Sequence, residues 1–117
     1  MEEKVYEYLV GYGFTVEQID FIEEKNENIY QVTTYHAEKI MEFLKTYNLT
    51  KEEIIKVVTS CPDLISQKKF NLDNIIKILN NLSFSTEEIA NLLKYKTKIF
   101  TINFKELKKK IVKKEQS

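Results

Sequence analysis

The chain has 117 residues, of which 43% are hydrophobic and 31% are charged, so we expect one globular domain over residues 1–117 and exclude collagen-like and disordered classes. Eighteen basic residues balance eighteen acidic ones, so the net charge predicts neither a polyanion-binding protein nor an enzyme for acidic substrates. Every basic residue is a lysine, which lacks the planar fork that arginine offers to guanine edges, so base-specific readout is disfavoured. Two glycines and one proline favour helices over hairpin-rich sheets.

The single cysteine and the single histidine limit the chemistry of the chain. Cys61 cannot form an intramolecular disulfide, and with His36 it cannot complete a four-ligand zinc site, so we expect no metal and no cofactor. A reducing, cytoplasmic location fits this cysteine usage best. The chain opens on acidic residues, and no apolar run approaches the ~20 residues that span a bilayer, so we expect neither an export signal nor a membrane anchor.

Charge is graded along the chain although the total is zero. Residues 1–35 hold eight acidic residues against two lysines. Residues 71–117 hold ten lysines against five acidic residues. The neutral total therefore hides a dipole that runs from an acidic start to a basic end.

Apolar positions recur at a period of 35 residues in three copies, which predicts an internal repeat. The first set has spacings of three and four, which place its members on one face of a helix. Its aligned members are Val5, Ile40 and Ile75, then Tyr8, Phe43 and Ile78, then Leu9, Leu44 and Leu79. After this helix, Gly13 and Asn48 suit the left-handed residue with which many helices end.

Each break is followed by a capping box, in which a hydroxyl accepts the amide three residues later and the side chain there reaches back. The three pairs are Thr15 with Gln18, Thr50 with Glu53, and Ser85 with Glu88. A second apolar helix and an apolar pair on a short helical turn follow each box. Their aligned positions are Ile19, Ile54 and Ile89; Ile22, Val57 and Leu92; Ile29, Leu64 and Ile99; and Tyr30, Ile65 and Phe100.

These patterns predict three units at about residues 3–37, 38–72 and 73–107, followed by a basic helix over residues 103–114. In that last helix Asn103 and Glu106 form a cap pair, and the buried stripe consists of Phe104, Leu107 and Ile111. About three such units are the minimum for a stable solenoid. We therefore expect an all-α fold, a short helical-repeat solenoid whose final helix caps the stack.

The stretch from Leu44 to Ser66 resembles a repeat of the mitochondrial transcription termination factor (mTERF) family. The resemblance rests on Leu44, a turn before Thr50, the acidic pair before Ile54, and Pro62 followed by two apolar residues. Residues 79–101 repeat the pattern with Thr97 at the proline position, and residues 9–31 repeat it with Glu27 there. Together these matches cover residues 5–107.

This resemblance implies a superhelical array of units, each with two α-helices and a short 3₁₀ turn, whose concave basic groove lies along nucleic acid. Family members that bind a duplex use more repeats and rely on arginine. This chain, by contrast, has three predicted units and no arginine. The implied function is a non-enzymatic nucleic-acid-binding or transcription-associated module with DNA or RNA as partner. The alternative is a protein–protein interaction adaptor that uses the solenoid surface.

A lysine-rich C-terminal half supplies the candidate nucleic-acid site, because lysines neutralise phosphates and release counterions. Its members are Lys68, Lys69, Lys94, Lys96, Lys98, Lys105, Lys108 and Lys109, with Lys110, Lys113 and Lys114 beyond them. Tyr95, between two of these lysines, is placed to stack on an exposed base. The alternative is that the lysines of the last helix form its solvated face.

The acidic first unit has two interpretations, a solvated helix face or a contact with a basic partner, which includes the basic end of a second copy. Catalysis has less support, because only Cys61 with His36 could supply a nucleophile and a base, and these lie on different predicted elements. We expect Cys61 to be buried and His36 to lie on a helix surface. The sequence therefore predicts no catalytic residue and no enzyme activity.

Overall fold

The computed structural model of the chain describes the backbone of residues 1–116 and the side chains of residues 1–111. Within this part of the chain every regular element is a helix, either an α-helix or a short 3₁₀ helix, and there is no strand. The prediction of an all-α fold is confirmed.

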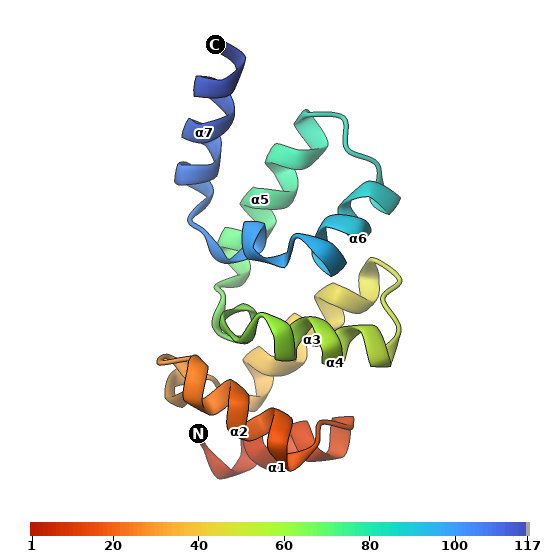
Figure 1. Ribbon diagram of the computed structural model, residues 1–117, viewed down its shortest axis with the longest axis vertical. Helices are drawn as coiled ribbons and strands as arrows, with labels where there is room; N and C mark the ends of the chain where they lie inside the picture. Colours follow the sequence, from red (N-terminus) through yellow and green to blue (C-terminus); the bar gives the residue numbers. More distant parts are fainter. Residues whose placement is uncertain (117) are drawn as a thin grey trace.

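The described helices occur three times in the order α-helix, α-helix, 3₁₀ helix before a final α-helix, and we call each such set a unit (Figure 1). The first unit contains α1 (Glu3–Tyr12), α2 (Val16–Lys25) and the 3₁₀ helix η1 (Ile29–Gln31). The second contains α3 (Thr34–Thr46), α4 (Lys51–Ser60) and η2 (Pro62–Ser66). The third contains α5 (Lys69–Asn81), α6 (Thr86–Tyr95) and η3 (Thr97–Thr101), and α7 (Phe104–Gln116) ends the described chain.

The three predicted capping boxes are confirmed. The hydroxyls of Thr15, Thr50 and Ser85 each accept the amide three residues later at 3.1 Å, and the side chain there accepts the cap amide in return. The preceding turns also behave as predicted, because Gly13 has a φ of 126° and Asn48 a φ of 64°, and Ser83 follows with 67°. Local cap and turn chemistry therefore sets where α2, α4 and α6 begin.

The first helices of the second and third units begin earlier than the sequence pattern predicts. α3 starts at Thr34 and α5 at Lys69, ahead of the expected unit boundaries at residues 38 and 73. Thr33 caps α3 by accepting the His36 amide at 3.1 Å. Asn103 precedes α7, and its side-chain Oδ1 accepts the Lys105 amide at 2.8 Å, whereas the Glu106 amide of the predicted cap pair donates to the Asn103 backbone carbonyl at 3.0 Å.

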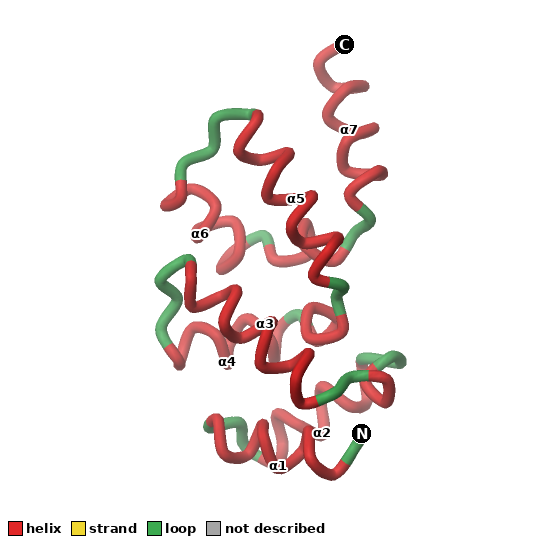
Figure 2. Tube along the Cα trace, turned by 180° about the vertical axis from the view of Figure 1, so that it is seen from behind, coloured by secondary structure: helices red, strands yellow, loops and turns green. Residues whose placement is uncertain are grey.

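The first helices α1, α3 and α5 form one layer, and the second helices form another behind it (Figure 2). One hydrophobic cluster runs between the layers from Val5 to Phe100. Tyr30 is a correction to the sequence analysis, because it is 67% exposed whereas its equivalents Ile65 and Phe100 are fully buried. The 3₁₀ helices η2 and η3 pack against the preceding unit. η1 belongs to the first unit of the described chain, so it has no preceding unit to pack against.

The molecule is elongated, with principal extents of 47 × 26 × 21 Å. The N-terminus and the C-terminal helix lie at opposite ends of the long axis (Figure 1). The charge gradient of the sequence therefore becomes a separation in space, with the acidic unit at one end and the lysine-rich helix at the other.

Candidate nucleic-acid interface

Two of the candidate lysines meet at one hollow between the starts of α5 and α7, which we call the junction hollow. It has a volume of about 540 Å³. Its lining residues are Ser66, Gln67, Lys68, Phe70, Asn71, Thr101, Asn103, Phe104 and Lys105. The fold thus brings Lys68 and Lys105, which are far apart in the sequence, to the same cavity.

Buried amide side chains hold the two walls of this hollow together. The Asn71 side chain is only 8% exposed, and its Nδ2 donates to the Ile102 carbonyl at 2.7 Å while its Oδ1 accepts the Phe104 amide at 2.8 Å. Gln67 Nε2 donates to the Phe100 carbonyl at 2.8 Å. These bonds fix the chain that leads into α7 against the start of α5, so the hollow is preformed.

An aromatic pair lines the hollow together with the two lysines. The rings of Phe70 and Phe104 meet edge to face with their centroids 5.8 Å apart, and Phe70 is 70% exposed. Lysine ammonium groups attract phosphates, and an exposed ring offers a stacking surface to any base. The junction hollow therefore combines the two features that sequence-tolerant binding of single-stranded nucleic acid requires.

Other candidate lysines have carboxylate partners and lie elsewhere. Lys94 Nζ is 3.2 Å from Glu53 Oε2 on α4. Lys69 pairs with Asp73, and its ammonium lies 5.5 Å from the centre of the Phe43 ring. Lys109 lies 4.0 Å from Glu106 on the same helix. These three lysines carry less unopposed charge than Lys68 and Lys105.

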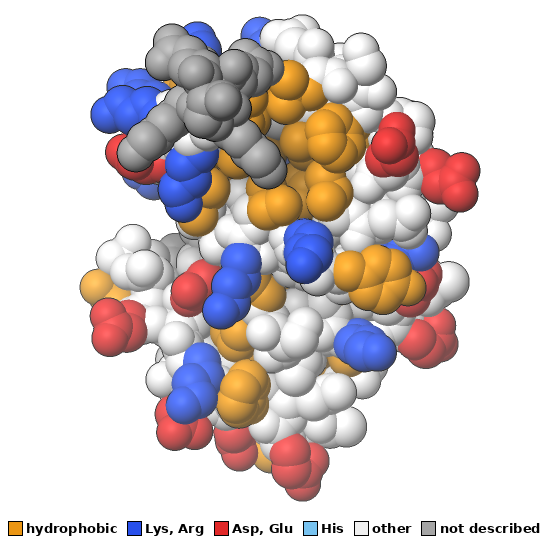
Figure 3. All heavy atoms as spheres, turned by 45° about the horizontal axis from the view of Figure 1, so that its top comes forward, with side chains coloured by type: hydrophobic (Ala, Val, Ile, Leu, Met, Phe, Trp, Pro, Cys, Tyr) orange, Lys and Arg blue, Asp and Glu red, His pale blue; other side chains and the backbone are white. Residues whose placement is uncertain are grey.

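The remaining candidates whose side chains are described do not line the junction hollow. Lys96, Lys98, Lys108 and Lys110 are exposed, and Tyr95 is exposed beside Lys96. Lys113 and Lys114 lie outside the residues whose side chains are described. Figure 3 shows lysines interspersed with acidic and hydrophobic side chains on the face it presents.

A neighbouring hollow continues the junction hollow toward the first unit. It has a volume of about 370 Å³ and shares Ser66, Gln67 and Thr101 with the junction hollow. Its charged lining residues are one lysine, Lys25, and two acids, Glu27 and Asp63. Of these two hollows, only the junction hollow has lysines as its only charged lining residues.

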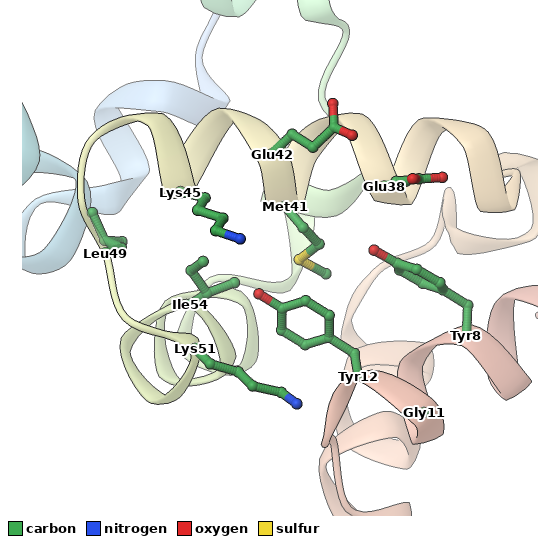
Figure 4. Close-up of a pocket in the computed structure, with 10 residues that line it drawn as sticks. All are labelled: Tyr8, Gly11, Tyr12, Glu38, Met41, Glu42, Lys45, Leu49, Lys51 and Ile54. Atoms are coloured by element: carbon green, nitrogen blue, oxygen red, sulfur yellow. The ribbon is translucent and has the colours of Figure 1, made fainter.

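A second type of hollow, which the sequence analysis did not find, lies between α1, α3 and α4 (Figure 4). It has a volume of about 600 Å³, and Figure 4 shows the Tyr8 and Tyr12 rings pointing from α1 toward α3. Its apolar members are Met41, Leu49 and Ile54. Its charged members are Glu38, Glu42, Lys45 and Lys51, so the hollow carries no net charge.

The two tyrosines of this hollow remain protonated at neutral pH. Burial raises the pKa of Tyr8, with Glu38 adding to the effect, and burial also raises the pKa of Tyr12. Lys51 Nζ lies 5.4 Å from the centre of the Tyr12 ring, a cation–π contact. A groove with rings, apolar side chains and both signs of charge suits a polypeptide better than a polyanion.

The same hollow recurs between α3 and α5, with a volume of about 390 Å³. Five of its lining residues are the equivalents, 35 positions later, of residues that line the hollow at α1. These are Phe43, Thr46, Tyr47, Asp73 and Ile76. The aromatic pairs Tyr8–Tyr12 and Phe43–Tyr47, each at helical spacing, are the sequence signal that points to these hollows.

The structure does not activate the thiol that was considered for catalysis. Burial raises the pKa of the Cys61 thiol, which disfavours the nucleophilic thiolate. Cys61 is buried, as expected, and His36 is half-buried on α3. Among the described residues no group of three or more potential ligands is placed to hold a metal ion, and no helix is both long and apolar enough to cross a membrane.

Comparison with known proteins adds a family to this geometry. The family model described as mTERF matches residues 1–113 of the chain. No curated protein gives a significant match, and no solved structure does. The matched range contains all three units and most of α7.

Proposed function

Because the chain belongs to the mTERF family, we propose that it is a non-enzymatic nucleic-acid-binding module whose three units are mTERF repeats of one short solenoid. The junction hollow carries this proposal, since Lys68, Lys105 and the Phe70–Phe104 pair line it together. A reducing, cytoplasmic location remains part of the proposal.

Single strands are the expected form of the ligand. An exposed phenyl ring can stack on an unpaired base but not on a base inside a duplex. The chain also has no arginine for bidentate contacts in a groove. We therefore expect single-stranded DNA or RNA to bind more tightly than a duplex, with little dependence on base sequence.

The test is the salt dependence of binding to short labelled single strands and duplexes, compared between the wild-type chain and the variant Lys68→Gln/Lys105→Gln. Each phosphate contact to a single strand contributes about 0.7 to the slope of log affinity against log salt, so loss of two contacts lowers the slope by about 1.4. The control, Lys4→Gln/Lys56→Gln, removes the same charge from α1 and α4. Equal weakening by both variants would show bulk attraction and would overturn the assignment of the site.

The mixed-charge hollow at α1, α3 and α4 supports a second candidate, a protein-interaction adaptor. Its rings, apolar side chains and lysine and glutamate residues match the chemistry of a protein interface. Nucleic-acid binding and the adaptor role differ in their dependence on salt. Absence of nucleic-acid binding at low salt, where lysine contacts are strongest, would favour the adaptor.

A further inference from the structure

Several positions that are buried in the first two units are uncovered in the third. Phe14 and Leu49 are buried, but their equivalent Phe84 is only half-buried. The same change separates Ile22 and Val57 from Leu92, and Ile29 and Leu64 from Ile99. A neighbouring element therefore covers these positions in the first two units but not in the third.

In the first two units, the second helix of the following unit packs against this side. α2 packs against α4 and η2, and α4 packs against α6. After the third unit only α7 follows in the described chain, and its main contact is with α5. We call the uncovered surface the open end and define it by Phe84, Leu92, Ile99, Lys96 and Lys110.

Both lysines of the open end stand at positions that are buried elsewhere. Lys96 is the equivalent of Asn26 and Cys61, and Lys110 is the equivalent of Ile40 and Ile75. All four of those residues are buried, whereas both lysines are exposed. Figure 3, which brings this end forward, shows hydrophobic side chains gathered beside lysines.

The opposite end of the molecule shows the reverse substitution. Three positions of the first unit carry polar or charged side chains where both later units are apolar. Asp20 stands where these units have Ile55 and Ala90, Glu23 where they have Val58 and Leu93, and Tyr30 where they have Ile65 and Phe100. Glu27 replaces Pro62 and Thr97. All four residues of the first unit are exposed, and we call this surface the acidic end.

We propose that the acidic end of one copy docks on the open end of a second copy, in place of a following unit. Glu23 pairs with the Met1 ammonium of its own chain at 3.0 Å, so the carboxylates of Asp20 and Glu27 in the first copy meet Lys96 and Lys110 of the second. The Tyr30 ring covers part of the apolar surface around Leu92. At the acidic end, carboxylates replace residues that are apolar or buried in the later units. At the open end, lysines replace residues that are buried in the earlier units. Because the two charges are opposite, a second copy of this chain is the occupant that fits the open end.

The contact is head to tail, because the two surfaces differ and lie at opposite ends of the long axis (Figure 1). Such a heterologous contact adds copies in a row and does not close into a symmetric dimer. Neither Lys96 nor Lys110 lines the junction hollow, so the proposal is independent of the proposed nucleic-acid site.

Sedimentation velocity over a concentration series, on protein freed of nucleic acid, measures the association directly. At about 0.01 M salt, where the Debye length is about 30 Å, the average mass rises with concentration above the 13.9 kDa of one chain. At about 1 M salt, where the Debye length is about 3 Å, the association constant falls at least about tenfold. A single 13.9 kDa species at low salt and high concentration would overturn the proposal and leave both ends as solvated caps.

Charge-reversal variants locate the contact. Asp20→Lys/Glu27→Lys and Lys96→Glu/Lys110→Glu each remain monomeric alone, and an equimolar mixture associates again because each variant now complements the other. The control Glu3→Lys/Glu17→Lys makes the same charge change at positions that are exposed in all three units, and it associates as the wild type does. Loss of association in the control, or a mixture that stays monomeric, would contradict the assignment; far-UV circular dichroism checks that every variant is folded.

Discussion

At the scale of single residues, buried amides join successive units. Asn26 is fully buried, and its Nδ2 donates to the Pro62 carbonyl at 2.9 Å and to Ser66 Oγ at 3.1 Å. Its Oδ1 accepts the Asn28 amide at 2.9 Å. One side chain thus links the end of α2 to the 3₁₀ helix of the next unit, as Asn71 links α5 to the chain before α7.

Replacement of Asn26 by alanine is expected to lower the free energy of unfolding by about 2–3 kcal/mol, because it removes three hydrogen bonds of a buried amide and leaves the part-buried Pro62 carbonyl and Asn28 amide without these partners. Urea denaturation measures the loss, and hydrogen exchange should quicken first in η1 and η2. The control Asn91→Ala, at an exposed position on α6, should change stability by no more than about 0.5 kcal/mol. Equal effects of the two substitutions would show that the Asn26 contacts contribute little.

At the scale of elements, the three capping boxes differ in whether they titrate. Glu53 and Glu88 accept the cap amides of α4 and α6, whereas Gln18 does so for α2. The backbone hydrogen bond from Ser85 holds the pKa of Glu88 below its ordinary value of 4.5. For Glu53 the Thr50 amide lowers the pKa, and Lys94 adds to it.

A lowered pKa in the folded state means that the unfolded chain binds more protons in acid. The carboxylate contribution of Glu88 is therefore present above the ordinary pKa and is lost as the pH falls through the lowered one. Glu88→Gln, which copies the Gln18 box, should be less stable than the wild type at neutral pH and should approach it in acid. Denaturation midpoints from pH 7 to 3 test this, with Glu87→Gln as a control that removes the same charge without touching Ser85; parallel profiles for wild type and Glu88→Gln would contradict it.

Cap and turn chemistry explains which elements the sequence could predict. Hydroxyls and carboxylates three residues apart, and the left-handed Gly13, act within one turn of chain, so the starts of α2, α4 and α6 were predictable. The starts of α3 and α5 were not predicted: Ala37 and Leu72 continue the apolar faces of Ile40 and Ile75 one turn earlier, among polar residues that form no capping box. For the proposed site, the sequence could predict only a set of candidate lysines. Only the fold shows that Lys68 and Lys105 line one hollow and that Lys94 pairs with Glu53.

At the scale of the whole molecule, each unit depends on the next one for part of its cover. This dependence makes equivalent positions unequal in energy along the array. Leu49, on the second unit, is 4% exposed, whereas Phe84, its equivalent on the third unit, is half-buried at the open end. Phe84 is the larger side chain, but a smaller fraction of its surface is buried than for Leu49.

Alanine at these two positions measures that inequality. Leu49→Ala is expected to cost about 2–5 kcal/mol, the range for a fully buried leucine, whereas Phe84→Ala should cost less than about 2 kcal/mol despite its greater size. Urea denaturation at about 1 M salt, where the proposed end-to-end contact is screened, makes the comparison on single chains. Val57→Ala and Leu92→Ala form a second pair at equivalent positions and should show the same order. If Phe84→Ala costs as much as Leu49→Ala under these conditions, the third unit is covered in the monomer, and the surface on which we place a second copy does not exist.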